Sequence, residues 1–559
     1  MSGFDRRLTR RRVLETAAAL AGTAGLSVFA ISCGGDEDSR AGAESPTAGA
    51  DSPTATTAGA ENTIVPTVAD GGSRRGGVLR VALTGDPPNL DIHQTTDSIV
   101  VLVCSHMYET LFTWDAEYRP VPLLAASHEV LDDGLRHRVV LQENVEFHNG
   151  EILSAADVIA SVERWSTISG LGEGLMEAVE SIEQVDELTI DFHMLERYGS
   201  FRTALSRQLQ GCSIYPASVL ANSSRTELAE YVGTGPYRFV EWLPDRHVQM
   251  ERFANYRPTE SDADGYAGAK AAYFDSIEFV PVRSEASRIA GMQANDFHFV
   301  ETISSDQAPV LQDASGVAVD ILPADAWVNI VLNLRSPLFA DLNIRRAIQI
   351  ALDHEQIMLA AVGEDYYELT PELVPGAPAW YSEAGIEYFN QNDPEEAKRL
   401  LEEAGYDGTP VRMMVTQEVQ QEYNATLTMK QQLEDVGFVV DLQVYDGATL
   451  SDRRDDEAVW ETYTASASFR PDPVMRNLSS SATGWWENDE KDKLFTELQT
   501  EADHDLRFEV WEQIQFMFYE DVPRLKIGNI RRVLARASAL QNIGPTSMQP
   551  EFSNAWLEE

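Results

Sequence analysis

Few residues of this chain have the types and the spacing that catalysis requires. The His-Glu pairs at 128–129 and 354–355 lack the second histidine of a His-Glu-x-x-His zinc motif, which excludes that class of metalloprotease. No Gly-x-Ser-x-Gly motif and no Cys-x-x-Cys pair occurs. The acids of Asp452–Glu457 could form a glycosidase carboxylate pair, but arginines lie among them, as in a solvated charged loop. We therefore predict a protein that is not an enzyme and holds no cofactor and no metal, with a secreted hydrolase as the enzymatic alternative.

Cys33 is the cysteine whose position indicates a covalent modification. It directly follows a basic start and an Ala/Gly-rich apolar stretch, Val13–Ile31, and the small Ser32 precedes it. The residues around Cys33 resemble a bacterial lipobox, and residues 9–14 resemble a twin-arginine export motif. The pattern predicts a signal peptide over residues 1–33 and acyl chains on Cys33 that anchor the exported protein to a membrane. It leaves open the export route, and whether the protein lies in a periplasm or on the outer face of the cytoplasmic membrane.

Residues 34–75 are rich in Ser, Thr, Ala and Gly, contain prolines and lack apolar periodicity. Such a composition cannot bury enough apolar surface to fold, so we expect a flexible tether. The predicted layout is a lipid anchor as the only membrane contact, followed by a tether and then a globular body.

The charge of the chain excludes one class of partner. The 43 Lys and Arg residues face 90 Asp and Glu residues, a formal net charge of −47. This surface repels phosphate backbones, so we predict no nucleic-acid partner. The remaining cysteines, Cys104 and Cys212, could form one disulfide or remain two buried thiols, and the sequence leaves both open.

The body alternates strand and helix patterns, which predicts a mixed α/β fold. Asn149-Gly150 indicates a tight turn, and Gly233–Trp242 indicates a glycine turn that leads into a strand, because no lysine of a phosphate loop follows. A β-α-β unit is predicted over 411–444, with parallel strands. We expect the other strands at 78–83, 136–141, 145–148, 188–194 and 327–334, and the other helices at 96–112, 154–165, 341–359, 393–405, 491–502 and 505–520.

A series of short motifs then carries a resemblance to a known family. In order along the chain they are Gly77–Ala82, Asn89–Asp91, Val145–Glu151, Ala155–Val158, Gly233–Tyr237, Asn343–Ile348, Ala404–Tyr406 and Pro471–Pro473. Together they resemble the family 5 extracellular solute-binding proteins, the group that binds dipeptides, oligopeptides, nickel and opines. The resemblance implies a type II (class C) periplasmic-binding-protein-like fold, with two lobes around a cleft and an extra α/β domain on lobe I. It also implies a monomer that delivers a small solute to ABC permease subunits.

The resemblance divides the body into segments that alternate between the lobes. Lobe I takes 76–119, 208–324 and 523–559, the extra domain 120–207, and lobe II 325–522. The implied passages between lobes lie near Ala324 and Pro523, and they form the expected hinge.

One segment departs from the peptide-binding pattern. Aligned on Pro471–Pro473, Phe469 stands where peptide-binding relatives have the Asp that pairs with the α-amine of a peptide. A cationic amine buried there would lack its partner, so peptide is only the default ligand, beside an oligosaccharide, an opine or a metal chelate. Arg470 favours a carboxylate or phosphate if it faces the cleft, and is otherwise a solvated arginine. Tryptophans are candidate stacking surfaces or core residues. The candidate ligand-binding residues are Trp327, Ala465, Ser466, Ala467, Ser468, Phe469, Arg470 and Trp485.

Overall fold

The computed structural model describes residues 7–9, 74–206, 208–476, 478–545 and 547–558. Cys33 and almost all of the predicted tether lie outside the described residues. Among the helices that are described, none combines the length and the hydrophobicity needed to cross a bilayer.

The body is built on one mixed sheet of eleven strands. β14 (Tyr367–Glu368) pairs only with β18. The other strands follow one another across the sheet in the order β16 (Val440–Tyr445), β15 (Val411–Thr416), β17 (Thr462–Ala467), β13 (Val317–Leu332), β18 (Arg524–Ala537), β12 (Phe299–Val300), β2 (Val78–Leu83), β11 (Ser276–Pro281), β10 (His247–Arg252) and β9 (Tyr237–Leu243).

The long antiparallel pair β13–β18 joins the two halves of this sheet. The β13 register is irregular between Ile321 and Ala326. On β18, Ile530 belongs to the same hydrophobic core as the 325–522 segment, whereas Val533 packs in the core of the other half. The first residues of β18 thus complete the core of the 325–522 segment, and its later residues pack in the core of the other half.

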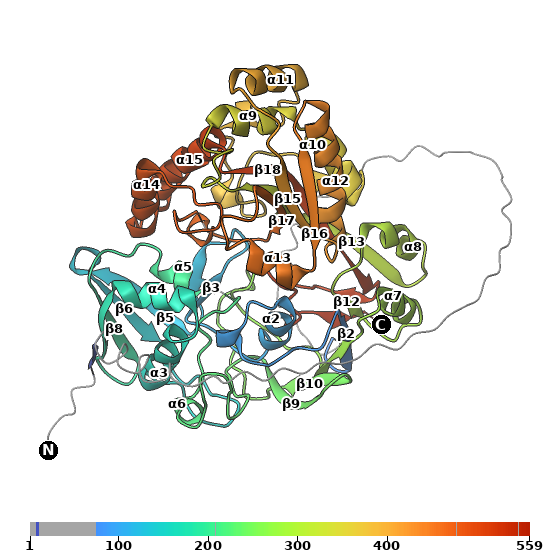
Figure 1. Ribbon diagram of the computed structural model, residues 1–559. Coiled ribbons are helices and arrows are strands. Elements are labelled where there is room, and N and C mark those ends of the chain that lie inside the picture. The colour runs from blue at the N-terminus through green and yellow to red at the C-terminus, as the bar shows by residue number, and fades with distance from the viewer. Residues whose placement is uncertain (1–6, 10–73, 207, 477, 546, 559) are drawn as a thin grey trace, which may run out of the picture.

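Helices cover both faces of the half that contains β13, β15 and β17 (Figure 1). Val328 and Ile330 of β13 pack under α9–α12, and Trp327, on the opposite face, packs under α14 and α15. This follows from the period of two in a strand, which sends successive side chains to opposite faces. The helices are α9 (Leu342–Ala351), α10 (His354–Val362), α11 (Pro394–Glu403), α12 (Gln420–Asp435), α13 (Gly447–Arg453), α14 (Asp489–Thr500) and α15 (His504–Asp521).

The other sheet half and a separate unit complete the body. The unit has its own five-stranded sheet, β1 (Arg7–Thr9), β7 (Val179–Gln184), β8 (Thr189–Met194), β6 (Arg136–Leu141) and β5 (Ala125–Leu131), and its own core. In Figure 1 it lies beside the main body with α3, α4 and α5 packed on it. The remaining elements are α2 (Ser98–Cys104), β3 (Phe112–Trp114), β4 (Pro120–Pro122), α3 (Ala155–Ser166), α4 (Gly170–Ala178), α5 (Phe201–Leu205), α6 (Ala217–Leu220), α7 (Glu285–Gln293), α8 (Ala308–Gln312), β19 (Leu540–Gln541) and β20 (Trp556–Leu557).

Most predicted elements are confirmed, including α3, which begins with a capping box at Ser154, and the parallel β15-α12-β16 unit. The single helix predicted over 341–359 is wrong, because Leu352 is extended and Asp353 caps a new helix by accepting a bond from the Gln356 N–H. The strand predicted at 145–148 is wrong as well. That segment closes a turn, with the Gly150 N–H donating to the Phe147 carbonyl.

The helix predicted over 96–112 ends at Cys104. The apolar residues at 100–104 of α2 are buried, but the backbone beyond the helix bonds to another segment. The Gly235 N–H donates to the Met107 carbonyl at 2.9 Å, and the Tyr237 N–H donates to the His106 carbonyl at 3.1 Å. The two open cysteine alternatives resolve as buried free thiols at Cys104 and Cys212.

Candidate ligand-binding site

Three cavities share lining residues: one is lined by residues 327–524, one by residues 92–270 and 551, and one by residues of both sets. The largest, of about 220 Å³, lies under Trp327 and is called the arginine cavity after Arg470, Arg476 and Arg524. It shares Arg470 with a small junction cavity whose lining joins residues 469–475 to residues near both ends of the body. The junction cavity shares Gln208 with a third, the acidic cavity, lined by Glu109 and Glu551. The shared lining residues make the three cavities neighbours, and together they form the candidate site.

The strand register builds the arginine cavity. Trp327 of β13 lies opposite Ala467 of β17, and Val331 lies opposite Arg524 of β18, so these residues share one face of the sheet. α15 covers that face with Trp511 and Phe518, and the ring centroids of Phe518 and Trp327 are 6.4 Å apart. The loop that follows β17 supplies Ser468, Arg470, Met475 and Arg476 to the cavity wall.

The cationic side chains of this cavity face no carboxylate among its described lining residues. Arg476 is 8% exposed, and its Nη1 donates to the Ser468 carbonyl at 2.9 Å. Its Nε and Nη2 are buried without a hydrogen-bond partner among the described residues. Burial, with repulsion from Arg470 and Arg524, lowers the pKa of Arg476 to about 9. Burial lowers the pKa of Arg470 and of Arg524 too. The field inside the cavity is therefore positive.

Lys526 is another buried cation close to Trp327. It is on β18 opposite Asn329, its ammonium is 6.0 Å from the Trp327 ring, and it donates to the Glu372 carbonyl oxygen. The Glu372 carboxylate is 3.9 Å away. Burial lowers the pKa of Lys526 to about 7, although Glu372 opposes this shift.

Packing explains why position 469 is a phenylalanine and not the aspartate of the peptide-binding pattern. Phe469 is buried in the wall of the junction cavity, with its ring centroid 4.7 Å from that of Tyr118. Asp472 cannot replace the missing carboxylate, because it caps the short helix after it and accepts two hydrogen bonds from Arg507, of 2.9 and 3.0 Å. It is the structural acid of this turn.

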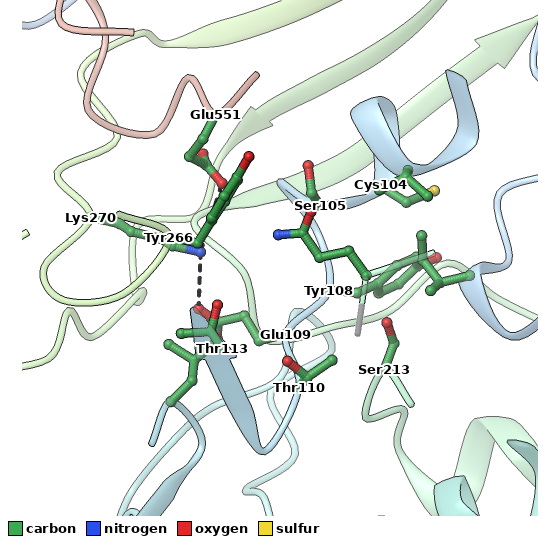
Figure 2. A pocket seen from close by; sticks show the side chains of 14 residues that line it. Cys104, Ser105, Tyr108, Glu109, Thr110, Thr113, Ser213, Tyr266, Lys270 and Glu551 are labelled. Carbon is green, nitrogen blue, oxygen red and sulfur yellow. Dashed lines mark ion pairs between the residues drawn. The ribbon is translucent and has the colours of Figure 1, made fainter. Parts of the chain in front are cut away.

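The acidic cavity, of about 40 Å³, carries the opposite charge. Figure 2 shows the Lys270 ammonium pointing at the Glu109 carboxylate, with Glu551 from the C-terminal segment on its other side. The nitrogen–oxygen distances are 3.7 Å to Glu109 and 3.9 Å to Glu551. Burial raises the pKa of Glu109. Two carboxyl groups thus face one ammonium here.

The structure brings together most of the predicted ligand-binding residues. Trp327, Ser466, Ala467 and Ser468 line the arginine cavity, Phe469 lines the junction cavity and Arg470 lines both. Two predicted residues, Ala465 and Trp485, are absent from these linings. The Ala465 carbonyl accepts a bond from Asn329, and the Trp485 ring packs 5.7 Å from Trp460 with Arg335 over it at 5.1 Å.

The sequence reasoning missed Arg476, Arg524, Trp511 and Phe518. A usable signal was present for Arg524, since Arg524-Leu525-Lys526-Ile527 alternates charged and apolar residues in a segment taken only as the start of lobe I. Arg476 lies in an irregular loop, where no periodicity predicts which way a side chain faces.

The linings of the arginine and junction cavities suit binding better than catalysis. The described residues of both contain no His, Cys, Asp or Glu, hence no general base of the usual kinds. They offer guanidinium, indole and hydroxyl donors around apolar walls, as in a solute-binding pocket. A hollow of about 620 Å³ elsewhere, on the outside of α3 and α6, includes Arg164, whose guanidinium is already paired with Asp91.

Comparison with known proteins agrees with this geometry. The chain is 23% identical over 461 residues to a probable peptide ABC transporter periplasmic-binding protein of Sinorhizobium fredii, covering 79% of this chain and 86% of that one. It is 24% identical over 479 residues to a glutathione-binding protein of Pectobacterium atrosepticum, covering 81% and 88%.

A solved structure shares the fold. The ABC transporter substrate-binding protein CtaP of Listeria monocytogenes superposes with a TM-score of 0.75 at 22% identity, over 87% of this chain and 100% of that one. The fold is thus the type II periplasmic-binding-protein fold. The family model described as bacterial extracellular solute-binding proteins, family 5 (middle), matches residues 119–486. This chain therefore belongs to the family 5 bacterial extracellular solute-binding proteins.

Proposed function

We propose that this chain is the substrate-binding lipoprotein of an ABC importer, which captures a peptide-like solute between two lobes and delivers it to permease subunits without converting it. The observation that carries the proposal is the arginine–junction pair of cavities, where Phe469 and Arg470 meet Val101, Trp114 and Met548 from the other half of the body. A solute held there contacts both halves, so its binding energy favours the closed arrangement.

The segment boundaries follow from the same proposal. Lobe II takes 325 to about 530, because the start of β18 packs in its core. Lobe I takes the remainder of the body outside the extra domain, whose core also includes Cys212 and Ile214 beyond the expected end at 207. The passages near Ala324 and Arg531, which lie opposite each other in the sheet, would act as the hinge. Lipid on Cys33 would hold this monomer near the permease.

The ligand class is tested by thermal shift and calorimetry on the purified chain. The panel consists of tetrapeptides, glutathione, oligosaccharides, opines and histidine-chelated nickel. A ligand at 100 times its Kd stabilises the closed protein by about 2.7 kcal/mol, so a binder raises the Tm by a measurable amount. Recovery of the bound solute unchanged supports a pure binder, whereas turnover would contradict the proposal. Binding by a sugar or an opine alone would replace peptide with that ligand.

Closure of the two lobes around the solute is tested by a separate measurement. Small-angle scattering in the presence of the bound solute should give a smaller radius of gyration than the empty protein in solution. An unchanged radius at saturation would contradict capture by lobe closure.

A further inference from the structure

The arginine cavity gathers positive charge, and no carboxylate is among its described lining residues. Three guanidinium groups line it, and the described lining includes no carboxylate, in a chain whose acids outnumber its bases by 90 to 43. In a chain with so many acids, the lack of a carboxylate in this lining is a property of the site and does not follow from the composition.

Arg476 carries the inference furthest. A guanidinium stays charged at neutral pH and carries five N–H donors in a planar fork. Arg476 is 92% buried, since only 8% of it is exposed, and two of its three nitrogens have no acceptor among the described residues. A buried charge without a partner is costly, and the cost is offset only when an anion arrives.

Neutral donors converge on the same space. The Nε1 atoms of Trp327 and Trp511 are buried without partners among the described residues, and both residues line the arginine cavity. Indole N–H groups only donate, so the pair suits an acceptor-rich group such as an oxyanion.

We propose that the arginine cavity binds an anionic oxygen group of the imported solute, a carboxylate or a phosphate, with the Arg476 fork as its main contact. This inference deepens the proposed function, on which it depends only for the statement that the anion belongs to an imported solute. The end of the solute that enters under Trp327 is then acidic. Arg470 and Arg524 attract it at longer range and support the contact with Arg476.

The first experiment needs no identified solute. The Tm of the wild-type chain, Arg476→Met and Arg399→Met is measured in sodium chloride and in inorganic phosphate at equal ionic strength. Arg399 is an exposed arginine on α11 that pairs with Glu396 and serves as the matched control. We expect phosphate to raise the Tm of the wild type and of Arg399→Met but not of Arg476→Met. In chloride alone, Arg476→Met should be at least as stable as the wild type, because it removes an unpaired buried charge; a purely structural Arg476 would make it less stable.

The second experiment separates the sources of the anion. Calorimetry compares tetra-alanine with its C-terminal amide, and glycerol 3-phosphate with glycerol. The member of a pair that carries the anion should bind about tenfold or more tightly, and this preference should vanish in Arg476→Met and partly return in Arg476→Lys. Preference within the first pair identifies a carboxylate, and within the second a phosphate.

The two proposals fail differently. An Arg476-dependent phosphate effect without binding of any solute in the panel would leave the anion site standing and overturn the importer role. Tight binding of neutral solutes, unaffected by Arg476→Met and without a phosphate effect, would overturn the anion site and leave the importer role intact.

Discussion

At the scale of single residues, two buried cations near Trp327 behave differently. Arg476 keeps its charge while its Nε and Nη2 have no acceptor among the described residues, whereas Lys526 donates to the Glu372 carbonyl oxygen. A lysine can release its proton when burial disfavours the charge, and an arginine effectively cannot. The pKa of Lys526, about 7, is far below the ordinary lysine value because of this burial.

Lys526 should therefore make stability depend on pH. Its pKa is lower in the folded state, so between about pH 7 and pH 10 the unfolded chain binds the extra proton and the free energy of unfolding rises with pH. Below that window both states are protonated and the full penalty remains. The Tm of Lys526→Met relative to wild type should be highest near pH 6 and fall by pH 9. Lys398→Met, on exposed α11, is the control, and an equal difference at both pH values would contradict the assignment.

Phe469 leads to a prediction about the ligand amine. Since no described carboxylate lines the arginine or junction cavity, a free α-amine gains no ion pair there. N-acetylated and free tetra-alanine should bind within about threefold of each other by calorimetry, because no charged hydrogen bond is lost. A strong preference for the free amine would show that another carboxylate, such as Glu109 or Glu551, receives it.

At the scale of elements, the end of α2 depends on two glycines. A Cβ at Gly233 would lie 2.2 Å from the Met107 carbonyl oxygen, and one at Gly235 would lie 2.6 Å from that of His106. These close approaches let the 233–237 segment bond to the backbone after α2, which replaces the helical bonds that the apolar stripe predicted.

Gly233→Ala should consequently destabilise the protein by about 2 kcal/mol or more, because backbone has to move. Gly174→Ala is the matched control, since Gly174 lies within α4 with nothing within 4 Å of an added Cβ. That control should be neutral or stabilising by up to about 1 kcal/mol. Denaturant unfolding measures both, and equal effects would contradict the steric argument.

The elements also show how far sequence reasoning reaches. Local signals sufficed for α3 and the β15-α12-β16 unit, because a capping box and a period of apolar residues lie within a few turns. They failed at 96–112, where the competing partner lies at 233–237, more than a hundred positions away in the chain. The site residues, too, fall into some that the sequence identifies and others that only the tertiary structure reveals. The 466–470 strand end was identified through its resemblance to a family, but Trp511 and Phe518 reach the cavity only through tertiary packing of α15.

At the scale of the whole molecule, the acidity dominates. A formal charge of −47 makes the compact state repel itself, and salt screens this repulsion over a Debye length of about 10 Å at 0.1 M. The Tm should rise when sodium chloride increases from about 0.01 M to about 0.3 M. A Tm that is flat or falls with salt would mean that the acids are already neutralised locally, for example by bound cations.

The enclosed arginines of this acidic protein have a kinetic consequence. An anionic solute would be repelled at long range by the surface and attracted only once inside, so its association rate should increase with ionic strength. Most charge-steered encounters slow down under the same change. At low ionic strength the protein would capture the anionic solute slowly, and at high ionic strength it would capture it quickly. The receptor would thus be suited to a saline environment.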